Sequence, residues 1–302
     1  APIRNELGIT HGQFGNIYAM ATIFSSVLLI WVGKKIDEYQ IFYYSFFVII
    51  LLFLSSLFFS FINSIFLLAI GIFLMRFSGQ GLMSHTSTTT ISRFFEKSRG
   101  KALSTIWFGL SSAEFILPVF VTYFFVIYSW RTVWQGIAII IILFLPIVIF
   151  NTIRSVKLES REKDQNPKIN LKIKSWRRVE VIKDFRFYIV SLNMLAMPWV
   201  ATGVFVYQSF ITESKMWSIY TIPKAFMVYS ITSIITLFFS GFLVDKFTSR
   251  KLIPLMNIPL LFAMLVLFYN EQEISAFIFL GLIGVSNGLA NVLGSSTWAE
   301  IY

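Results

Sequence analysis

Nine apolar runs, each of about 20 residues, occupy most of this chain and restrict what it can fold into. A helix needs about 20 mainly apolar residues to cross the hydrocarbon core of a bilayer. Runs of this length predict membrane-spanning helices, because the shorter alternating segments of a closed barrel are absent. The predicted fold is therefore an all-α integral membrane bundle, with spans at residues 14–32, 41–62, 65–90, 102–127, 134–152, 186–211, 222–243, 252–270 and 275–297.

Composition supports the membrane assignment and excludes several kinds of site. Only 13% of the 302 residues are charged, whereas a soluble domain carries about 25%. The chain has no cysteine, so neither a disulfide framework nor thiol chemistry is expected. The two histidines, His11 and His85, lie far apart in the sequence, so we expect no metal site and no cofactor.

The basic residues alternate with the spans and predict the orientation of the bundle. If the loop after the first span is assigned to side one, all but five of the 25 Lys and Arg residues fall on side one. The positive-inside rule makes side one cytoplasmic, with loops 33–40, 93–101, 153–185 and 246–251 facing the cytoplasm. A net charge of +10 distributed in this way indicates a bilayer and not nucleic acid as the partner. The five exceptions are Arg4, Arg131, Lys215, Lys224 and the intramembrane Arg76.

A weak internal repeat divides the chain into two halves. Gly33-x-x-x-Asp37 returns as Gly241-x-x-x-Asp245 at an offset of 208 positions, and Gln80-Gly81 returns as Asn287-Gly288 at an offset of 207. The polar, charged segment 153–185 lies between the halves and is expected to be a cytoplasmic linker. We therefore predict half-bundles at 1–152 and 186–302 with the same orientation in the membrane.

Several motifs resemble those of the major facilitator superfamily along nearly the whole chain. The two Gly-x-x-x-Asp loops resemble that family's loops between spans two and three and between spans eight and nine. The stretch Arg76-x-x-Gly79-Gln80-Gly81 resembles its fourth-span motif, and Ser129-Trp130-Arg131-x-x-Trp134 resembles its outer turn before span six. Further resemblances are Arg93-Phe94-Phe95 followed by Arg99-Gly100-x-Ala102, Gly109-x-x-x-x-Glu114-x-x-x-Pro118, and Trp298-Ala299-Glu300 at the end of span ten.

The resemblance extends to bacterial members near the monocarboxylate and oxalate–formate porter branch. It implies that the nine spans correspond to family spans two to ten, that the family's first, eleventh and twelfth spans lie outside this chain, and that the membrane is a bacterial inner membrane. The chain departs from the family pattern in two places. Glu38-Tyr39-Gln40 replaces the usual Gly-Arg-Arg of the first loop, and the eighth span lacks an arginine between Phe226 and Phe239.

Arg76 and Glu114 are the candidate residues for solute binding or proton coupling. Arg76 lies 17 residues before Arg93, about 26 Å from the cytoplasmic edge, and Glu114 lies 13 residues after Lys101, about 20 Å deep. A lone cation at that depth costs about 3 kcal/mol, so Arg76 should face a partner or a water-filled cavity. The alternative is a permanent structural ion pair between Arg76 and Glu114.

Three more polar residues are candidates for contact with a solute. Gln80 follows Arg76 by one helical turn and shares its face, and Tyr207 and Gln208 are predicted at the corresponding depth in the second half. Hydrogen bonding between helices is the competing interpretation for these side chains, as it is for Asn193, Asn287 and Asn291.

The two repeated loops predict a cytoplasmic gate. An aspartate at such a loop can accept hydrogen bonds from helix N-termini and from arginines across the bundle, which would stabilise one closed state. The alternative is that the cations only set the topology. The predicted gate comprises Gly33, Asp37, Arg93, Arg99, Gly241, Asp245, Lys246, Arg250 and Lys251.

These features favour a secondary active transporter, working as a monomer, that moves a small solute by alternating access, with proton coupling as the expected mechanism. No nucleotide-binding Gly-x-x-x-x-Gly-Lys-Ser/Thr loop occurs, so ATP-driven transport has no support. A solute sensor that binds without transporting is the alternative. An integral-membrane enzyme would need a cluster of acids or histidines at one interface, and the acids here are scattered.

Overall fold

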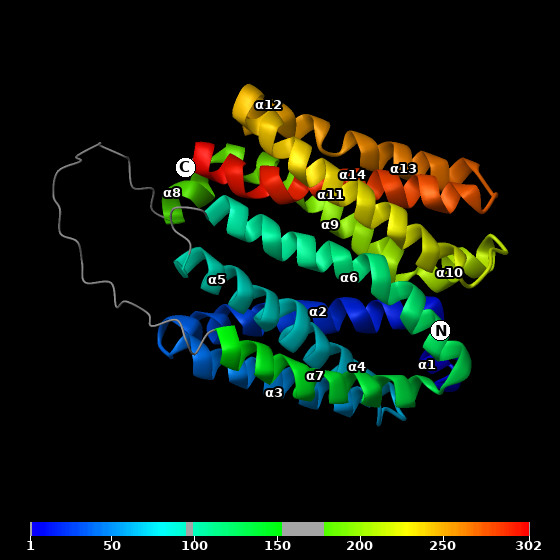
Figure 1. Ribbon diagram of the computed structural model, residues 1–302. Helices are drawn as coiled ribbons and strands as arrows, with labels where there is room; N and C mark the ends of the chain where they lie inside the picture. Colours follow the sequence, from blue (N-terminus) through cyan, green and yellow to red (C-terminus); the bar gives the residue numbers. More distant parts are fainter. Residues whose placement is uncertain (1, 95–98, 153–177, 302) are drawn as a thin grey trace. The chain divides into compact units, whose positions relative to one another are not determined.

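The computed structural model of the protein describes residues 2–94, 99–152 and 178–301 (Figure 1). These residues form helices and no strands. Nine of their helices are long and apolar enough to cross a membrane, and each overlaps one predicted span, which confirms the all-helical membrane bundle. The candidate spans are His11–Asp37, Ile41–Phe59, Ile65–Ile91, Ile106–Ile127, Trp130–Asn151, Phe185–Val206, Thr221–Val244, Ser249–Tyr269 and Ile274–Gly294.

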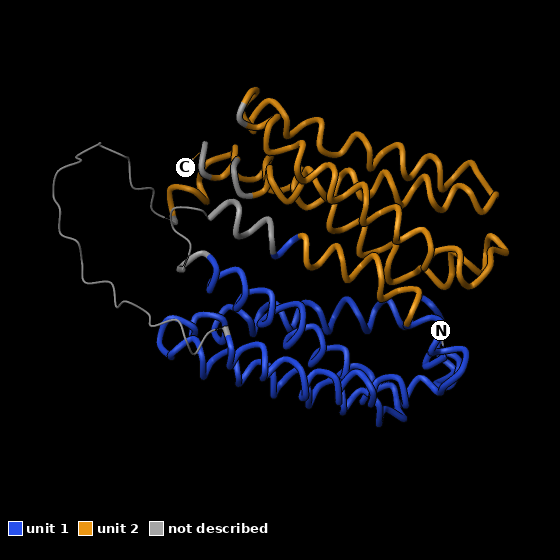
Figure 2. The backbone as a smooth tube through the Cα atoms, viewed as in Figure 1, with its two compact units in different colours: residues 1–107, 121–159 blue, residues 108–120, 160–302 orange. Residues whose placement is uncertain are grey.

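The chain divides into two compact units, coloured separately in Figure 2. Unit 1 contains residues 1–107 and 121–159, and unit 2 contains residues 108–120 and 160–302. The division expected from sequence places all of 1–152 in one half, whereas here the middle of helix α6 (Arg99–Ile127) groups with unit 2. Residues 153–177 of the expected linker lie outside the described residues.

Two helices of unit 1 begin at recognisable side-chain caps. Thr10 and Gln13 form a capping box at the start of α2, in which each side chain bonds the other's backbone N–H. Ser64 caps α4 by accepting from the backbone N–H of Leu67 at 3.3 Å. Besides part of α6, the elements are α1 (Pro2–Glu6), α2 (His11–Lys34), η1 (Lys35–Asp37), α3 (Ile41–Phe59), α4 (Ile65–Met75), η2 (Arg76–Met83), α5 (Ser84–Phe94) and α7 (Trp130–Thr152).

Glu6 ties three segments of unit 1 together at the end opposite the Gly33 loop. Its carboxylate accepts hydrogen bonds from Arg131 Nη2 at 2.6 Å and from the Trp130 indole at 2.9 Å. Arg131 Nη2 also donates to the backbone carbonyl of Ile62 at 2.8 Å, between α3 and α4. The hydrogen bonds from Arg131 and Trp130 lower the pKa of Glu6 to about 2. We call this group the Glu6 clamp.

Unit 2 contains the rest of the chain, with its first long helix capped by Asp184. Asp184 accepts from the backbone N–H of Arg186 at 3.0 Å. Besides residues 108–120 of α6, the elements are α8 (Arg178–Lys183), α9 (Phe185–Val206), α10 (Gln208–Ser214), α11 (Thr221–Phe247), α12 (Ser249–Leu252), η3 (Ile253–Leu255), α13 (Ile258–Tyr269) and α14 (Ile274–Ile301).

Glycines bring α14 against the backbone of α11. A Cβ atom added at Gly284 would lie 2.3 Å from the backbone oxygen of Tyr229, and one at Gly288 would lie 2.6 Å from that of Ser233. Thr232 Oγ1 also donates to the Gly281 carbonyl at 2.8 Å. The small-x-x-x-small spacing of Gly284 and Gly288 is typical of such a close approach between helices.

Asparagines of unit 2 bond between helices. The Asn287 amide donates to Ser233 Oγ at 2.9 Å, and the Asn257 amide donates to the Asn193 carbonyl oxygen at 2.8 Å. Asn193 and Asn287 therefore act as interhelical hydrogen-bonding residues, which is the role that the competing interpretation gave them.

Lys215 and Trp217 form a second clamp in unit 2, at the loop between α10 and α11. Lys215 Nζ donates to the backbone carbonyl of Asn270 at 2.9 Å and to the Glu271 carboxylate at 3.0 Å. The Trp217 indole donates to the Glu271 backbone carbonyl at 2.6 Å. These bonds tie the loop before α11 to the loop between α13 and α14, and we call the group the Lys215 clamp.

Apolar side chains remain exposed along the spans. On α7, Leu143 and Phe144 are 57% and 62% exposed, and on α11 Phe242 is 73% exposed. Contiguous apolar surface of this extent is rare on soluble monomers and indicates contact with lipid or another helix. The exposed faces therefore fit the membrane assignment made from hydropathy.

Candidate functional site

Arg76 begins a π-helical stretch, η2, in the middle of the third candidate span. The helix is α-helical before it, in α4, and after it, in α5. A π-helix bonds residue i to residue i+5 and is usually a single wide turn that occurs often at functional sites. The sequence places Arg76 correctly within a span, but its hydropathy does not reveal the change in helix type.

Small residues make the wide turn possible and connect it to its neighbours. Ser78 donates to the Leu74 carbonyl at 2.7 Å and to Ser55 Oγ of α3 at 3.2 Å. A Cβ at Gly81 would lie 3.4 Å from the Arg76 carbonyl oxygen, five residues earlier, and 3.5 Å from Leu29 of α2. Both ends of the stretch are therefore held by helices of unit 1.

Arg76 has an aromatic ring beside it. Its guanidinium carbon lies 5.0 Å from the centroid of the Tyr18 ring on α2, within cation–π distance. The side chain is half-buried, and among the described residues no carboxylate forms an ion pair with it. Gln80, which follows by four residues, is exposed.

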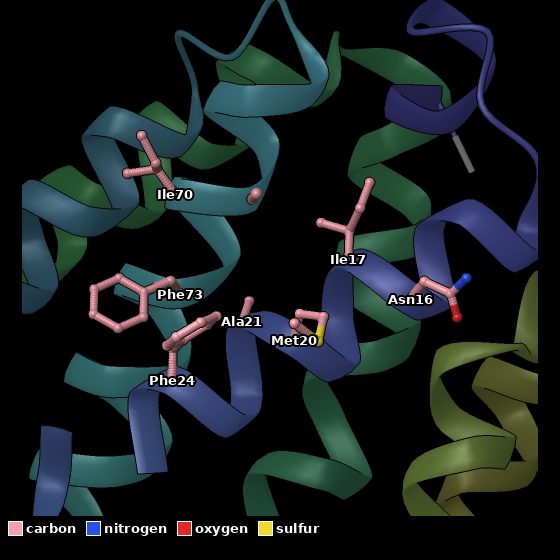
Figure 3. Close-up of a pocket in the computed structure, with 8 residues that line it drawn as sticks. Asn16, Ile17, Met20, Ala21, Phe24, Ile70 and Phe73 are labelled. Carbon is pink, nitrogen blue, oxygen red and sulfur yellow. The ribbon is translucent and has the colours of Figure 1, made fainter. Parts of the chain in front are cut away.

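An apolar hollow of about 520 Å³ lies between α2 and α4 (Figure 3). Phe73, one turn before Arg76, lines the hollow, and Ile17, next to Tyr18, lines the opposite side. Asn16 is the one amide among its lining residues. The hollow is thus a mainly apolar space whose lining includes neither Arg76 nor Tyr18; its remaining lining residues are Met20, Ala21, Phe24, Ala69 and Ile70.

Glu114 lies in the part of α6 that groups with unit 2. Its Oε2 atom is buried and has no hydrogen-bond partner among the described residues. Tyr229 of α11 is close enough to interact with it electrostatically. Tyr229 is itself 2% exposed and contacts the rings of Phe205 and Phe226 at centroid distances of 5.7 Å. Glu114 is therefore a half-buried acid beside an aromatic cluster.

Tyr207 and Gln208 lie at a break between two helices. Tyr207 ends α9 with a φ of −96° and a ψ of 12°, and α10 begins at Gln208. Both residues follow the candidate span Phe185–Val206, so they lie just past its end and not near its middle. Both are half-buried, and the Gln208 amide makes no hydrogen bond within the described part of the chain.

The Gly33 loop contacts a histidine that the sequence did not connect with it. His85 Nε2 lies 3.1 Å from the Gly33 carbonyl oxygen, and a Cβ added at Gly33 would lie 3.4 Å from the same ring. Tyr44 of α3 donates to the neighbouring Val32 carbonyl at 3.0 Å. Gly33 is thus a buried contact point between α2, α3 and α5, and Asp37 follows it at the end of η1.

The second loop contains a residue with unusual backbone geometry. Thr248 has a φ of 65° and a ψ of 149° between α11 and α12. Gly241 has open space where a Cβ would stand, and Lys246 Nζ lies 5.4 Å from the Phe247 ring centroid. Arg250 and Lys251 lie in the last turn of α12. The side chains of Arg93, Arg99 and Asp245 lie outside the described residues, so contacts within the predicted gate remain predictions.

Comparison with known proteins shows a family match over the entire chain. The family model described as Major Facilitator Superfamily matches residues 1–302. A search of curated proteins found no match.

Proposed function

Because the chain belongs to the major facilitator superfamily, whose members are secondary transporters of small solutes, we propose that it moves a small organic anion together with protons. The observation that supports this best is Arg76, a half-buried cation in a membrane-spanning helix. Its neighbour is the Tyr18 ring, and no described carboxylate neutralises it. A cation kept at such a depth without an acidic partner is well suited to attract an anionic solute.

Solute recognition then combines the charge of Arg76 with the apolar surface near it. A guanidinium can bind a carboxylate through two parallel hydrogen bonds, which fixes the orientation of the anion. An apolar group on the solute would gain from burial beside Phe73 and Tyr18. Gln80, Tyr207 and Gln208 supply further polar groups to the proposed solute path.

Proton binding is assigned to Glu114. Its Oε2 atom is buried without a hydrogen-bond partner in the described part of the structure, and the protonation of such an acid depends on nearby charge. If the anion and the proton both favour one conformation, each increases the affinity for the other by the same factor. This linkage would drive solute uptake with an inward proton gradient.

The alternating-access cycle would use the two repeated loops as a cytoplasmic gate. The basic loops 33–40, 93–101, 153–185 and 246–251 are assigned to the cytoplasmic side by the positive-inside rule. We propose a monomer in a bacterial inner membrane, with one half rocking against the other. The buried contact between Gly33 and His85 supports a packed junction at this end of unit 1.

Uptake by the purified full chain in proteoliposomes would test this function. The probes are labelled lactate and oxalate, with glucose and alanine as uncharged and zwitterionic comparisons, each with and without an acidic exterior. We expect uptake of an anion that the proton gradient stimulates. Arg76→Gln should raise the half-saturating concentration by about 10-fold or more, since a lost hydrogen bond to a charged group costs about 1.5–3 kcal/mol.

Two variants separate the assigned roles. Glu114→Gln should abolish stimulation by the proton gradient while exchange of labelled for unlabelled anion continues. Lys224→Gln, which changes an exposed cation, should leave both properties unchanged. Anion uptake that ignores the gradient in the unmodified protein, or gradient-stimulated uptake retained in a folded Glu114→Gln variant, would rule out the proposed coupling.

A further inference from the structure

Equivalent positions of the two units are buried alike, at an offset of 208 in the first part of the repeat. Leu68 and Ile72 of α4 are buried, as are Ala276 and Leu280 of α14. Ser78 and Ser286, also 208 positions apart, are both fully buried and both donate to a neighbouring segment of their unit: Ser78 to Ser55 Oγ and Ser286 to the Met256 carbonyl. Buried positions and a buried serine donor therefore recur at this offset as far as Ser78, although the two acceptors, Ser55 and Met256, are not counterparts.

From Gly81 onward the offset becomes 207. A Cβ added at Gly81 would lie 3.5 Å from the Leu29 side chain, and one added at its counterpart Gly288 would lie 2.6 Å from the Ser233 carbonyl oxygen and 2.9 Å from the Leu237 nitrogen. Leu29 and Leu237 are themselves 208 positions apart. Unit 1 therefore contains one extra residue between Ser78 and Gly81. Because Gln80 corresponds to Asn287, the extra residue is Gly79.

The extra residue coincides with the change in helix type. Gly79 lies inside the π-helical stretch η2, whereas α14 is α-helical from Ile274 to Ile301. A π-turn contains one more residue per hydrogen-bonded ring than an α-turn. The wide turn thus absorbs Gly79, and the flanking positions Ser78 and Gly81 stay against neighbouring helices of unit 1.

The packing of the neighbouring helix differs between the two units. At the offset of 208, Arg76 corresponds to Gly284, where an added Cβ would lie 2.3 Å from the Tyr229 carbonyl and from Thr232 Oγ1. Position 284 therefore has no room for a side chain. Tyr229 and Thr232 correspond to Ala21 and Phe24 of unit 1, and both of these line the open hollow between α2 and α4.

We propose that Gly79 is a positioning residue, inserted in one copy of the repeated helix, that places the Arg76 side chain where a solute can reach it. The extra residue widens the helix at the position where the second copy packs tightly on its neighbour. Ser78 and Gly81 meanwhile keep the helix attached to α3 and α2. This inference rests on the proposed function for the identity of the solute, and the geometry of the insertion is independent of it.

Deletion of Gly79 tests the inference. The expected product is a folded protein whose helix is continuous, as α14 is, because both flanks retain their contacts. Gly79→Ala keeps the chain length and is the matched control, since its Cβ would lie 3.4 Å from the flexible end of Leu52. Deletion of Ala290 from α14, which has no π-turn to absorb the loss, should instead disrupt folding.

Two readouts separate the inference from the proposed function. The chain has no cysteine, so Arg76→Cys can be labelled alone with a charged methanethiosulfonate reagent. We expect the deletion to slow labelling at position 76 by about 10-fold or more, and Gly79→Ala to change it less than about 2-fold. For anion uptake with Arg76 present, the deletion should raise KM by about 10-fold, with a smaller change in the maximal rate. This rise in KM corresponds to about 1.4 kcal/mol of binding free energy.

Each outcome is informative. An unfolded deletion variant, or a folded one with unchanged labelling at position 76, would overturn the inference. Slowed labelling with an unchanged KM for lactate and oxalate would support the inference about Gly79 and contradict the role of Arg76 in anion binding. Slowed labelling with a raised KM would support both.

Discussion

The backbone carbonyls of Ile62 and Asn270 stand 208 positions apart, and each accepts a hydrogen bond from a basic side chain of its own unit. Arg131 donates to Ile62 at 2.8 Å, and Lys215 donates to Asn270 at 2.9 Å. Each cation also binds a glutamate, and each clamp contains a tryptophan indole. The two units thus satisfy the corresponding carbonyl with similar chemistry supplied from different positions in the chain.

The Glu6 clamp should give the protein a stability that depends on acid pH. Since Arg131 and Trp130 lower the pKa of Glu6 from 4.5 to about 2, the carboxylate stabilises the folded state above about pH 4.5. That contribution is lost progressively as the pH falls toward 2. The melting temperature of the native protein should therefore exceed that of Glu6→Gln at pH 7, and the difference should shrink at pH 3.

A matched change tests whether any lost carboxylate has this effect. Glu38→Gln removes an exposed ion pair with Lys35, and such pairs contribute little to stability. Its melting temperature should track that of the native protein at both pH values. A Glu6→Gln difference that stays constant from pH 7 to pH 3 would contradict the assigned pKa.

The Lys215 clamp predicts a specific cost for losing the Trp217 indole. Trp217→Phe leaves the Glu271 backbone carbonyl without its donor, so unfolding should become easier by about 1 kcal/mol. Thermal unfolding in detergent would measure the change. Trp199→Phe serves as the control, because Trp199 is 79% exposed whereas Trp217 is 7% exposed. Equal effects of the two substitutions would argue against the bond.

The close packing of α11 on α14 predicts that one methyl group is harmful at Gly284. The Cβ of Gly284→Ala would overlap the Tyr229 carbonyl oxygen, so the helices must separate, at a cost of about 1–3 kcal/mol. Gly294→Ala has nothing within 4 Å of its new Cβ and should be neutral or stabilising by up to about 1 kcal/mol. Differential scanning fluorimetry of both variants checks the contrast, and a stable Gly284→Ala protein would refute it.

Replacement of Thr248 by glycine should increase the stability of the protein. Its φ of 65° and ψ of 149° fall in a region that essentially only glycine occupies without strain. Thr248→Gly should therefore raise the free energy of unfolding by about 1 kcal/mol, whereas Thr248→Ala, which keeps a Cβ, should bring no such gain. The comparison requires only melting curves, and a destabilised Thr248→Gly variant would show that the threonine side chain outweighs the backbone strain.

Hydropathy and residue spacing were sufficient to predict the spans and a closely packed face on α14, though not that α11 is its partner. Both depend on patterns of many residues, such as an apolar run or the Gly284–Gly288 spacing, that persist when individual residues vary. The role of Asn287 as an interhelical donor also follows from its polarity within an apolar helix. The clamps were not predicted, because Glu6 and Arg131 meet only through tertiary structure.

The candidate site was harder to predict than the fold, because its features depend on individual residues and not on long patterns. Arg76 is identified by its charge within a span, but π- and α-helical turns have the same hydropathy, so η2 was missed. The only signal of η2 in the sequence was that the offset between the two copies of the repeat changes by one residue between Gly33 and Gln80. The break at Tyr207 has no proline or glycine at the break itself to announce it, and the contact of His85 with Gly33 connects segments 52 residues apart.

The wide turn around Gly79 also has an evolutionary consequence. A single added codon inserts one residue, which in an ordinary α-helix rotates all later side chains about the helix axis. Selection would eliminate most such insertions. Where a broad turn can take up the added residue, the neighbouring packing survives, so one member of a duplicated gene segment can diverge while its twin keeps the ancestral scaffold. Asymmetry between two halves of a carrier can therefore arise in one genetic step.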